Sequence, residues 1–235
     1  MPYYGYGYYF DPTYILVLIG LAISLIASGK VKGTYAKYSK VRSRSGMTGA
    51  QAADRILKSA GLYEVRIEHI AGSLTDHYDP RTKVLRLSDS VYGSASVAAI
   101  GVAAHECGHA IQDDHSYAPL RIRNSLVPVA NIGTQAAWPI ILAGLFLGSS
   151  SFLINLGILL FSLGVLFQLV TLPVEFDASA RAIRILGDSG ILYEEEVKQT
   201  RKVLSAAAMT YVAAAAASIL SLLRLLILFG GRSRD

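Results

Sequence analysis

The chain has 235 residues, of which 52% are hydrophobic and only 17% charged. The hydrophobic residues are clustered in long runs, which excludes an ordinary soluble domain and is typical of membrane spans. The formal net charge of +5 comes from basic residues beside those runs, with no basic stripe of the kind that nucleic-acid-binding proteins carry.

The chain begins with a segment rich in Tyr and Gly, residues 1–11, which has neither the basic region nor the cleavage site of a signal peptide. The run from Phe10 to Ser28 is apolar and long enough to cross a bilayer. Basic residues follow it directly: Lys30, Lys32, Lys37, Lys40, Arg42 and Arg44. By the positive-inside rule this end of the span is cytoplasmic, which places the N-terminus outside.

The next stretch has the composition of a small globular domain. Thr48 and Gln51 form a capping box and Gly61 a C-cap, so we expect a helix over residues 49–60. Apolar and polar residues roughly alternate over 65–70, which predicts a short, half-buried strand.

A hairpin is predicted after that strand. The segments Ser73–Tyr78 and Lys83–Leu87 flank Asp79-Pro80-Arg81-Thr82, and Pro at the second position of a four-residue turn favours a reversal of the chain. We expect a helix to follow through Ala98–Gln112, capped by Ser88 or Ser94.

Three further apolar segments cover about 126–147, 152–174 and 203–229. The link between the first two, residues 148–151, is short enough to make them an antiparallel membrane hairpin. The stretch 175–202 is polar, helix-prone and basic, and we interpret it as cytoplasmic.

One motif in the sequence is typical of a catalytic zinc site. His105-Glu106-Cys107-Gly108-His109 fits the pattern H-E-x-x-H, in which both imidazoles share one face of a helix and can bind the same zinc ion. Glu106 is then placed to act as the general base on a water molecule. A five-residue match can arise by chance, but these polar residues follow a small apolar helix, where they would be costly without a partner.

The third zinc ligand has two candidates in the sequence. His115 lies where an elongated H-E-x-x-H-x-x-G-x-x-H motif has its third histidine, but Gln112 occupies the glycine position. Glu175 follows a membrane hairpin, and a hairpin returns the chain to the side from which it started, so we favour Glu175. The alternative is that Glu175 or Asp177 is a helix-start carboxylate stabilised by the helix dipole.

The chain resembles the neutral zinc metallopeptidase family of small bacterial multi-pass membrane proteins. The stretches that carry this resemblance run nearly from end to end: Val31-Lys32-Gly33-Thr34, residues 74–83 with Thr-Asp-His-Tyr-Asp-Pro, residues 104–112 and residues 169–176 with Leu-Pro-Val-Glu-Phe. More distantly, the layout is similar to gluzincin membrane proteases of the CAAX-prenyl-protease and heat-shock types.

The gluzincin resemblance implies that His105, His109 and Glu175 bind one Zn²⁺ per chain. Those proteases usually have Asp four residues after the glutamate, where this chain has Ser179. Which side chain orients His105 or His109 is therefore left open. The resemblance also implies substrate binding by strand addition at a sheet edge from residues 73–87. His77 is a candidate oxyanion stabiliser, although a structural role in the turn is the alternative.

These observations predict a mainly α membrane protein with about four transmembrane helices and a small α+β zincin-like catalytic domain. The expected parts are an N-terminal transmembrane helix (1–29), a cytoplasmic zincin-like domain (30–125), a transmembrane hairpin (126–174), a cytoplasmic segment with the third ligand (175–202) and a C-terminal transmembrane helix and tail (203–235).

The predicted function is zinc-dependent endopeptidase activity at the cell membrane. The catalytic domain would face the cytoplasm, with protein or peptide substrates near the bilayer and no nucleic-acid partner. The alternative is a non-proteolytic, zinc-stabilised membrane scaffold or chaperone-like protein. A transporter is disfavoured because the spans hold almost no ionisable residues at their centres.

Overall fold

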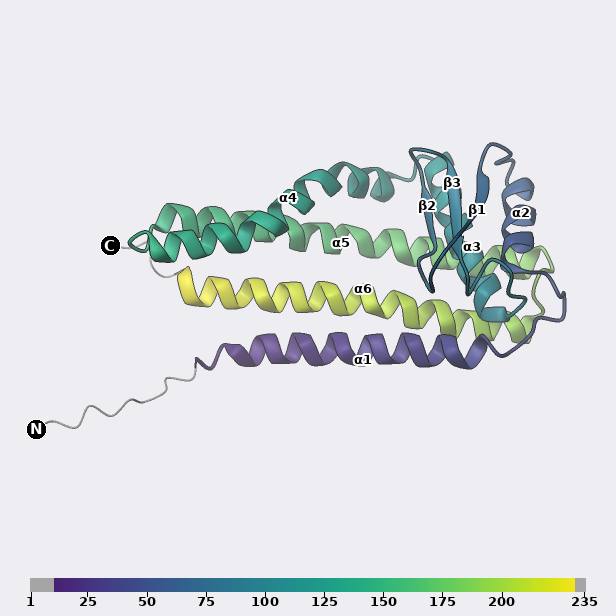
Figure 1. The fold of residues 1–235 in the computed structure, drawn as a ribbon, viewed down its shortest axis with the longest axis horizontal. Coiled ribbons are helices and arrows are strands. Elements are labelled where there is room, and N and C mark those ends of the chain that lie inside the picture. Colours follow the sequence, from purple (N-terminus) through teal and green to yellow (C-terminus); the bar gives the residue numbers. More distant parts are fainter. Residues whose placement is uncertain (1–10, 231–235) are drawn as a thin grey trace, which may run out of the picture.

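Four long helices form the body of the molecule in a computed structural model that describes residues 11–230. They are α1 (Tyr14–Tyr38), α4 (Ala118–Phe146), α5 (Ser151–Asp188) and α6 (Glu194–Phe229). Each is long and apolar enough to cross a membrane. The helices lie side by side, and the small elements gather at one end of the bundle (Figure 1). The chain is thus a mainly α membrane protein with a small α+β domain, as predicted.

The small domain contains two helices and a three-stranded sheet. Its elements are α2 (Gly49–Ser59), β1 (Arg66–Ile70), β2 (His77–Asp79), β3 (Val84–Ser88) and α3 (Val97–Asp114). The strand order is β1-β3-β2, with β1 parallel and β2 antiparallel to β3. Strand β2 is therefore an edge strand, and it lies against α3.

Local sequence signals explain several of these elements. The Thr48 side chain accepts a hydrogen bond from the Gln51 backbone N–H, and the Gln51 side chain accepts one from the N–H of Thr48, which confirms the predicted capping box. The N-cap of α3 is Ser96, so the expectation of Ser88 or Ser94 is wrong. Ser88 is unavailable because it ends β3, where its N–H and hydroxyl both donate to Asp76.

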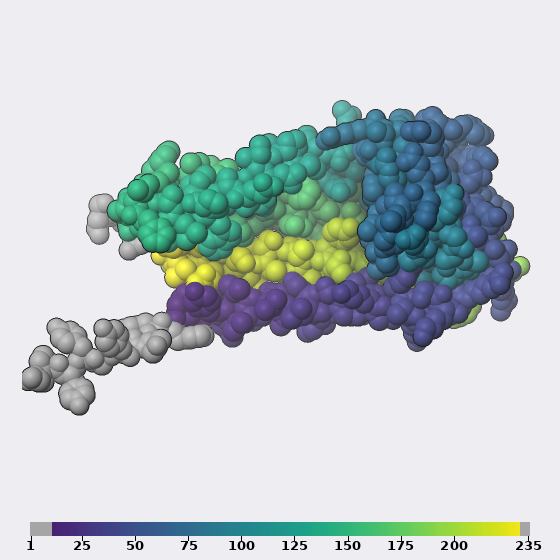
Figure 2. Space-filling view, in the orientation of Figure 1, coloured from purple at the N-terminus to yellow at the C-terminus, as the bar shows by residue number. Residues whose placement is uncertain are grey.

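Helix α3 lies at the centre of the small domain's core. Its apolar side chains pack with α2, the sheet, the end of α5 and the beginning of α6. Gly108 permits a close crossing of α3 and α5, because a Cβ atom there would lie 2.7 Å from the Ala178 carbonyl oxygen. In the space-filling view the domain covers one end of the bundle (Figure 2).

Helices α5 and α6 continue beyond the ends of the predicted spans. The stretch 175–202 is not a separate element: α5 runs through its first part to Asp188, and α6 begins at Glu194. Glu175 and Asp177 therefore lie inside α5 rather than at a helix start, and the helix-dipole alternative is wrong. Figure 1 shows α4 bent along its length, and the helix contains Pro128 and Pro139, the usual cause of such bends.

Candidate metal centre

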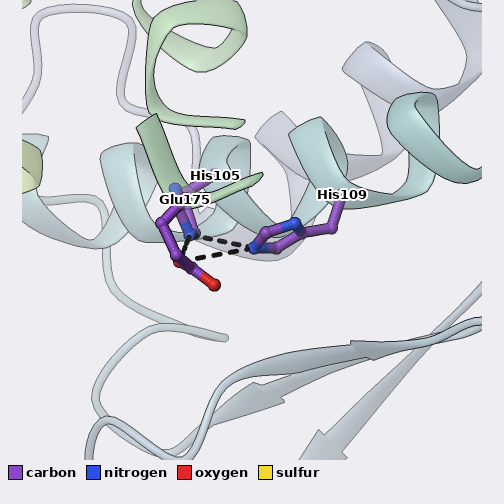
Figure 3. A group of neighbouring side chains, drawn as sticks. All are labelled: His105, His109 and Glu175. Atoms are coloured by element: carbon purple, nitrogen blue, oxygen red, sulfur yellow. Dashed lines mark hydrogen bonds and ion pairs between the residues drawn. The ribbon is translucent and has the colours of Figure 1, made fainter. Parts of the chain in front are cut away.

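Three side chains from two helices meet where α3 of the small domain packs against α5. His105 and His109 project from α3, and Glu175 projects toward them from α5 (Figure 3). The Nε2 atoms of the histidines are 3.2 Å apart, and Glu175 Oε2 lies 3.3 Å from His105 Nε2 and 3.7 Å from His109 Nε2. The side chains are only 15%, 11% and 4% exposed for His105, His109 and Glu175.

The spacing of these three atoms fits a zinc ion. Ligands about 2.0–2.1 Å from a tetrahedral zinc ion are about 3.3 Å from one another, close to the observed separations. Glu175 Oε2 is buried and lacks a well-formed hydrogen bond within the described residues, which is costly for a carboxylate unless a cation is near. Burial acts to lower the pKa of His109, but its contact with Glu175 and the charges of Glu106 and Glu175 raise it overall. The site therefore favours positive charge.

The ring orientation of His109 is set by Gln112, one turn later on α3. The Gln112 amide nitrogen donates to the Val174 carbonyl oxygen and to Asp177 Oδ2, both at 2.8 Å. Its amide oxygen therefore faces His109 Nδ1, at 2.9 Å. Because that oxygen can only accept, His109 must carry a proton on Nδ1, so the neutral ring has its lone pair on Nε2, where it can bind a metal.

The ring of His105 contacts a different residue, which lies on α5. Its Nδ1 lies 3.1 Å from the hydroxyl oxygen of Ser179, one turn after Glu175. Ser179 stands where the distant gluzincin pattern has aspartate, and here it contacts a histidine of the cluster. Asp177 is held by an ion pair with Arg181, so it reaches the cluster only through Gln112.

Glu106 lies beside the cluster and faces the sheet edge. It is 8% exposed, and its Oε2 accepts a hydrogen bond of 3.0 Å from the backbone N–H of Tyr78 in β2. Glu106, His105 and Glu175 line two adjoining cavities of about 180 Å³ each. A water molecule or a peptide group thus has room next to the carboxylate.

The remaining candidates lie at different distances from the cluster. His115 caps the end of α3 with a side chain 61% exposed and is not part of the group, which argues against it as a ligand. His77 lines the same cavity as His105, and its Nδ1 is 2.9 Å from the Thr75 carbonyl oxygen. Cys107 faces α2, where its thiol contacts the Ala53 carbonyl oxygen, and burial raises its pKa well above the ordinary value.

Several residues in or beside the site were given no role in it from the sequence. Gln112 and Ser179 were noted only as departures from known motifs, and their contacts with His109 and His105 could have been predicted, because each lies one helical turn after a predicted ligand. Arg123 on α4 and Tyr211 on α6 also line the cavity, but they come from distant helices and no local pattern marks them.

Comparisons with known proteins agree with this geometry. Residues 13–230 match the model of a family described as "Putative neutral zinc metallopeptidase". The chain is 50% identical over 221 residues, 94% of its length, to "Putative membrane protease YugP" of Bacillus subtilis (strain 168), of which the match covers 98%. No solved structure matches the chain.

Proposed function

The chain belongs to the neutral zinc metallopeptidase family, and from this premise we propose that it is a zinc-dependent membrane endopeptidase. His105, His109 and Glu175 hold the zinc ion, and Glu106 is the catalytic base. The observation that carries the proposal is the approach of three metal-binding atoms at tetrahedral spacing beside a buried carboxylate with free cavity space.

Each residue of the site has a separate role in the proposed peptide hydrolysis. A bound zinc ion would supply Lewis acidity, polarising a carbonyl and lowering the pKa of water toward about 7. Glu106 accepts the proton of the attacking water and later delivers it to the leaving amine. Its hydrogen bond from the Tyr78 N–H fixes the carboxylate in the cavity, and Gln112 keeps His109 in the tautomer that binds a metal.

The substrate backbone has a binding surface at the free edge of β2. This strand pairs with β3 on one side only, and the N–H of Tyr78 on the other side points toward Glu106. An extended peptide added along this edge would pass through the cavity that holds Glu106 and the three metal-binding side chains, where a water molecule activated by Glu106 could attack its carbonyl carbon. His77 is a candidate to donate to the developing oxyanion, because it lines the same cavity.

We also propose that the site faces the cytoplasm. The end of α1 nearest the small domain carries Lys30, Lys32 and Lys37, and Lys40 follows the helix directly. The start of α6 at the same end carries Lys198, Arg201 and Lys202. This excess of positive charge is typical of the cytoplasmic side of a membrane protein. Proteins in or beside the inner leaflet are then the accessible substrates.

The Glu106→Gln variant tests the proposal against a zinc-stabilised scaffold. Purified protein in lipid nanodiscs is loaded with zinc and assayed on a quenched-fluorescent peptide library. We expect Glu106→Gln to retain zinc and to lose activity by about 10²–10⁴-fold, the usual contribution of a general base. Equal cleavage by the variant and the wild type would contradict the role of Glu106, and zinc-loaded protein without any cleavage would support the scaffold instead.

A further inference from the structure

Arg123 is a charged side chain inside the candidate active site. It projects from α4 and lines the cavity that also contains His105, Glu106 and Glu175. Its Nε atom is buried and makes no hydrogen bond with any described residue. Within the part of the chain that the structure describes, residues 11–230, no carboxylate forms an ion pair with it.

This arrangement is costly for an arginine. The guanidinium group stays protonated at all physiological pH values, so it cannot avoid the cost of burial by losing its charge. Other partly buried arginines of this chain have carboxylate partners: Arg181 pairs with Asp177, and Arg86 with Glu68 and Asp79.

A general attraction of basic residues to the membrane surface does not explain the position of Arg123. Arg121, two residues earlier on α4, is exposed and does not line the cavity, so its charge is free to contact the membrane surface. Arg123 is instead turned inward, toward the cavity that also contains Tyr211 and Asn124.

The acidic groups of the cavity already have partners. Glu106 accepts the hydrogen bond of the Tyr78 N–H, Asp76 accepts from the N–H and hydroxyl of Ser88, and Glu175 Oε2 faces the two histidine Nε2 atoms. The planar fork of a guanidinium matches a carboxylate through two parallel hydrogen bonds, which is the strongest neutralisation available to a buried arginine. A carboxylate from outside the chain would complete the site.

We propose that Arg123 binds a carboxylate of the substrate peptide and makes the enzyme selective for it. This inference rests on the proposed peptidase function and adds the class of substrate. A peptide bound along the edge of β2 lies in the same cavity as Arg123, because Tyr78 and Arg123 both line it. The carboxylate belongs either to an acidic side chain near the scissile bond or to the C-terminus of the substrate.

Matched peptides separate these two sources. Zinc-loaded protein in nanodiscs is given quenched-fluorescent peptides that differ only by Glu against Gln near the cleaved bond, or only by a free against an amidated C-terminus. We expect kcat/KM to be about 10- to 100-fold higher for the carboxylate member of one pair, the range for a charged hydrogen bond. The pair that shows the preference identifies the source.

The Arg123→Gln variant then tests the residue itself. We expect the ratio within the selective pair to fall to about one, while Arg123→Lys keeps part of it, and Arg121→Gln, the exposed control on the same helix, keeps all of it. A wild-type ratio near one in both pairs, or an unchanged ratio in Arg123→Gln, would overturn the proposal.

Failure of the peptidase function is recognised separately, because then no peptide is cleaved in a Glu106-dependent way. In that case the same labelled peptides are titrated against zinc-loaded protein by fluorescence anisotropy. Tighter binding of carboxylate peptides that is lost in Arg123→Gln would still support the assignment of Arg123. Equal binding of acid and amide forms would overturn it.

Discussion

Gln112 accepts a hydrogen bond from Nδ1 of His109 at 2.9 Å, and this contact determines which nitrogen of the imidazole is free for a metal. The same amide group is bound on its other side to the Val174 carbonyl oxygen on α5, so Gln112 also joins the helix of the histidines to the helix of Glu175. Gln112 stands where the elongated zinc motif has glycine, and in this chain it orients His109 and links α3 to α5.

Replacing Gln112 with methionine, which has a similar size but cannot form these bonds, should weaken zinc binding. His109 loses the group that fixes its tautomer, and such outer partners typically contribute about 10- to 100-fold to metal affinity. We expect a rise of the zinc Kd in this range, measured by competition with a chromophoric chelator. A Kd equal to that of the wild type would show that the contact does not orient His109.

Gly108→Ala should disturb the crossing of α3 and α5. The added Cβ would lie 2.7 Å from the Ala178 carbonyl oxygen, and a backbone atom cannot move aside as a side chain can. Overpacking of this kind typically costs about 1–3 kcal/mol. We expect a lower Tm in detergent and a weaker affinity for zinc, because Glu175 lies on the displaced helix.

Gly33→Ala is the control for this substitution. Gly33 lies in α1, and a Cβ atom added there would meet no other described part of the protein within 4 Å apart from its own helix. Its replacement should therefore leave the Tm unchanged or slightly higher, since alanine favours a helix more than glycine does. Equal Tm values and zinc affinities for the two variants would contradict the tight crossing at Gly108.

Cys107 should be chemically inert although it lies within the H-E-x-x-H motif. Burial raises the pKa of its thiol, so the reactive thiolate is scarcer near neutral pH than for an ordinary cysteine. We expect almost no labelling by a maleimide in the folded protein, full labelling after denaturation in SDS, and normal zinc content in Cys107→Ala. Rapid labelling of the folded protein would mean that α3 is exposed at this face.

Local sequence patterns predict much of this fold, and distant contacts account for what they miss. The capping box at Thr48 and the Pro80 turn predict α2 and the β2–β3 hairpin because both depend on neighbouring residues. The polar composition after residue 174 predicts the end of a membrane span, but it does not end the helix, since α5 continues to Asp188.

The site shows the same division between local and distant information. His105 and His109 are four residues apart, and their shared helix face follows from spacing alone. Counting the membrane spans between α3 and Glu175 predicts that Glu175 lies on the same side as the two histidines. In the structure the three side chains lie together. Arg123 and Tyr211 reach the cavity from α4 and α6, and their positions depend on how four helices pack.

The zinc content of Glu175→Ala and His115→Ala tests the central claim most directly. Both variants are purified in parallel with the wild type, dialysed against the same zinc-buffered solution and analysed by inductively coupled plasma mass spectrometry, with folding checked by circular dichroism. We predict that Glu175→Ala loses bound zinc, whereas His115→Ala binds as much as the wild type. Zinc retained by Glu175→Ala and lost by His115→Ala would contradict the site of His105, His109 and Glu175.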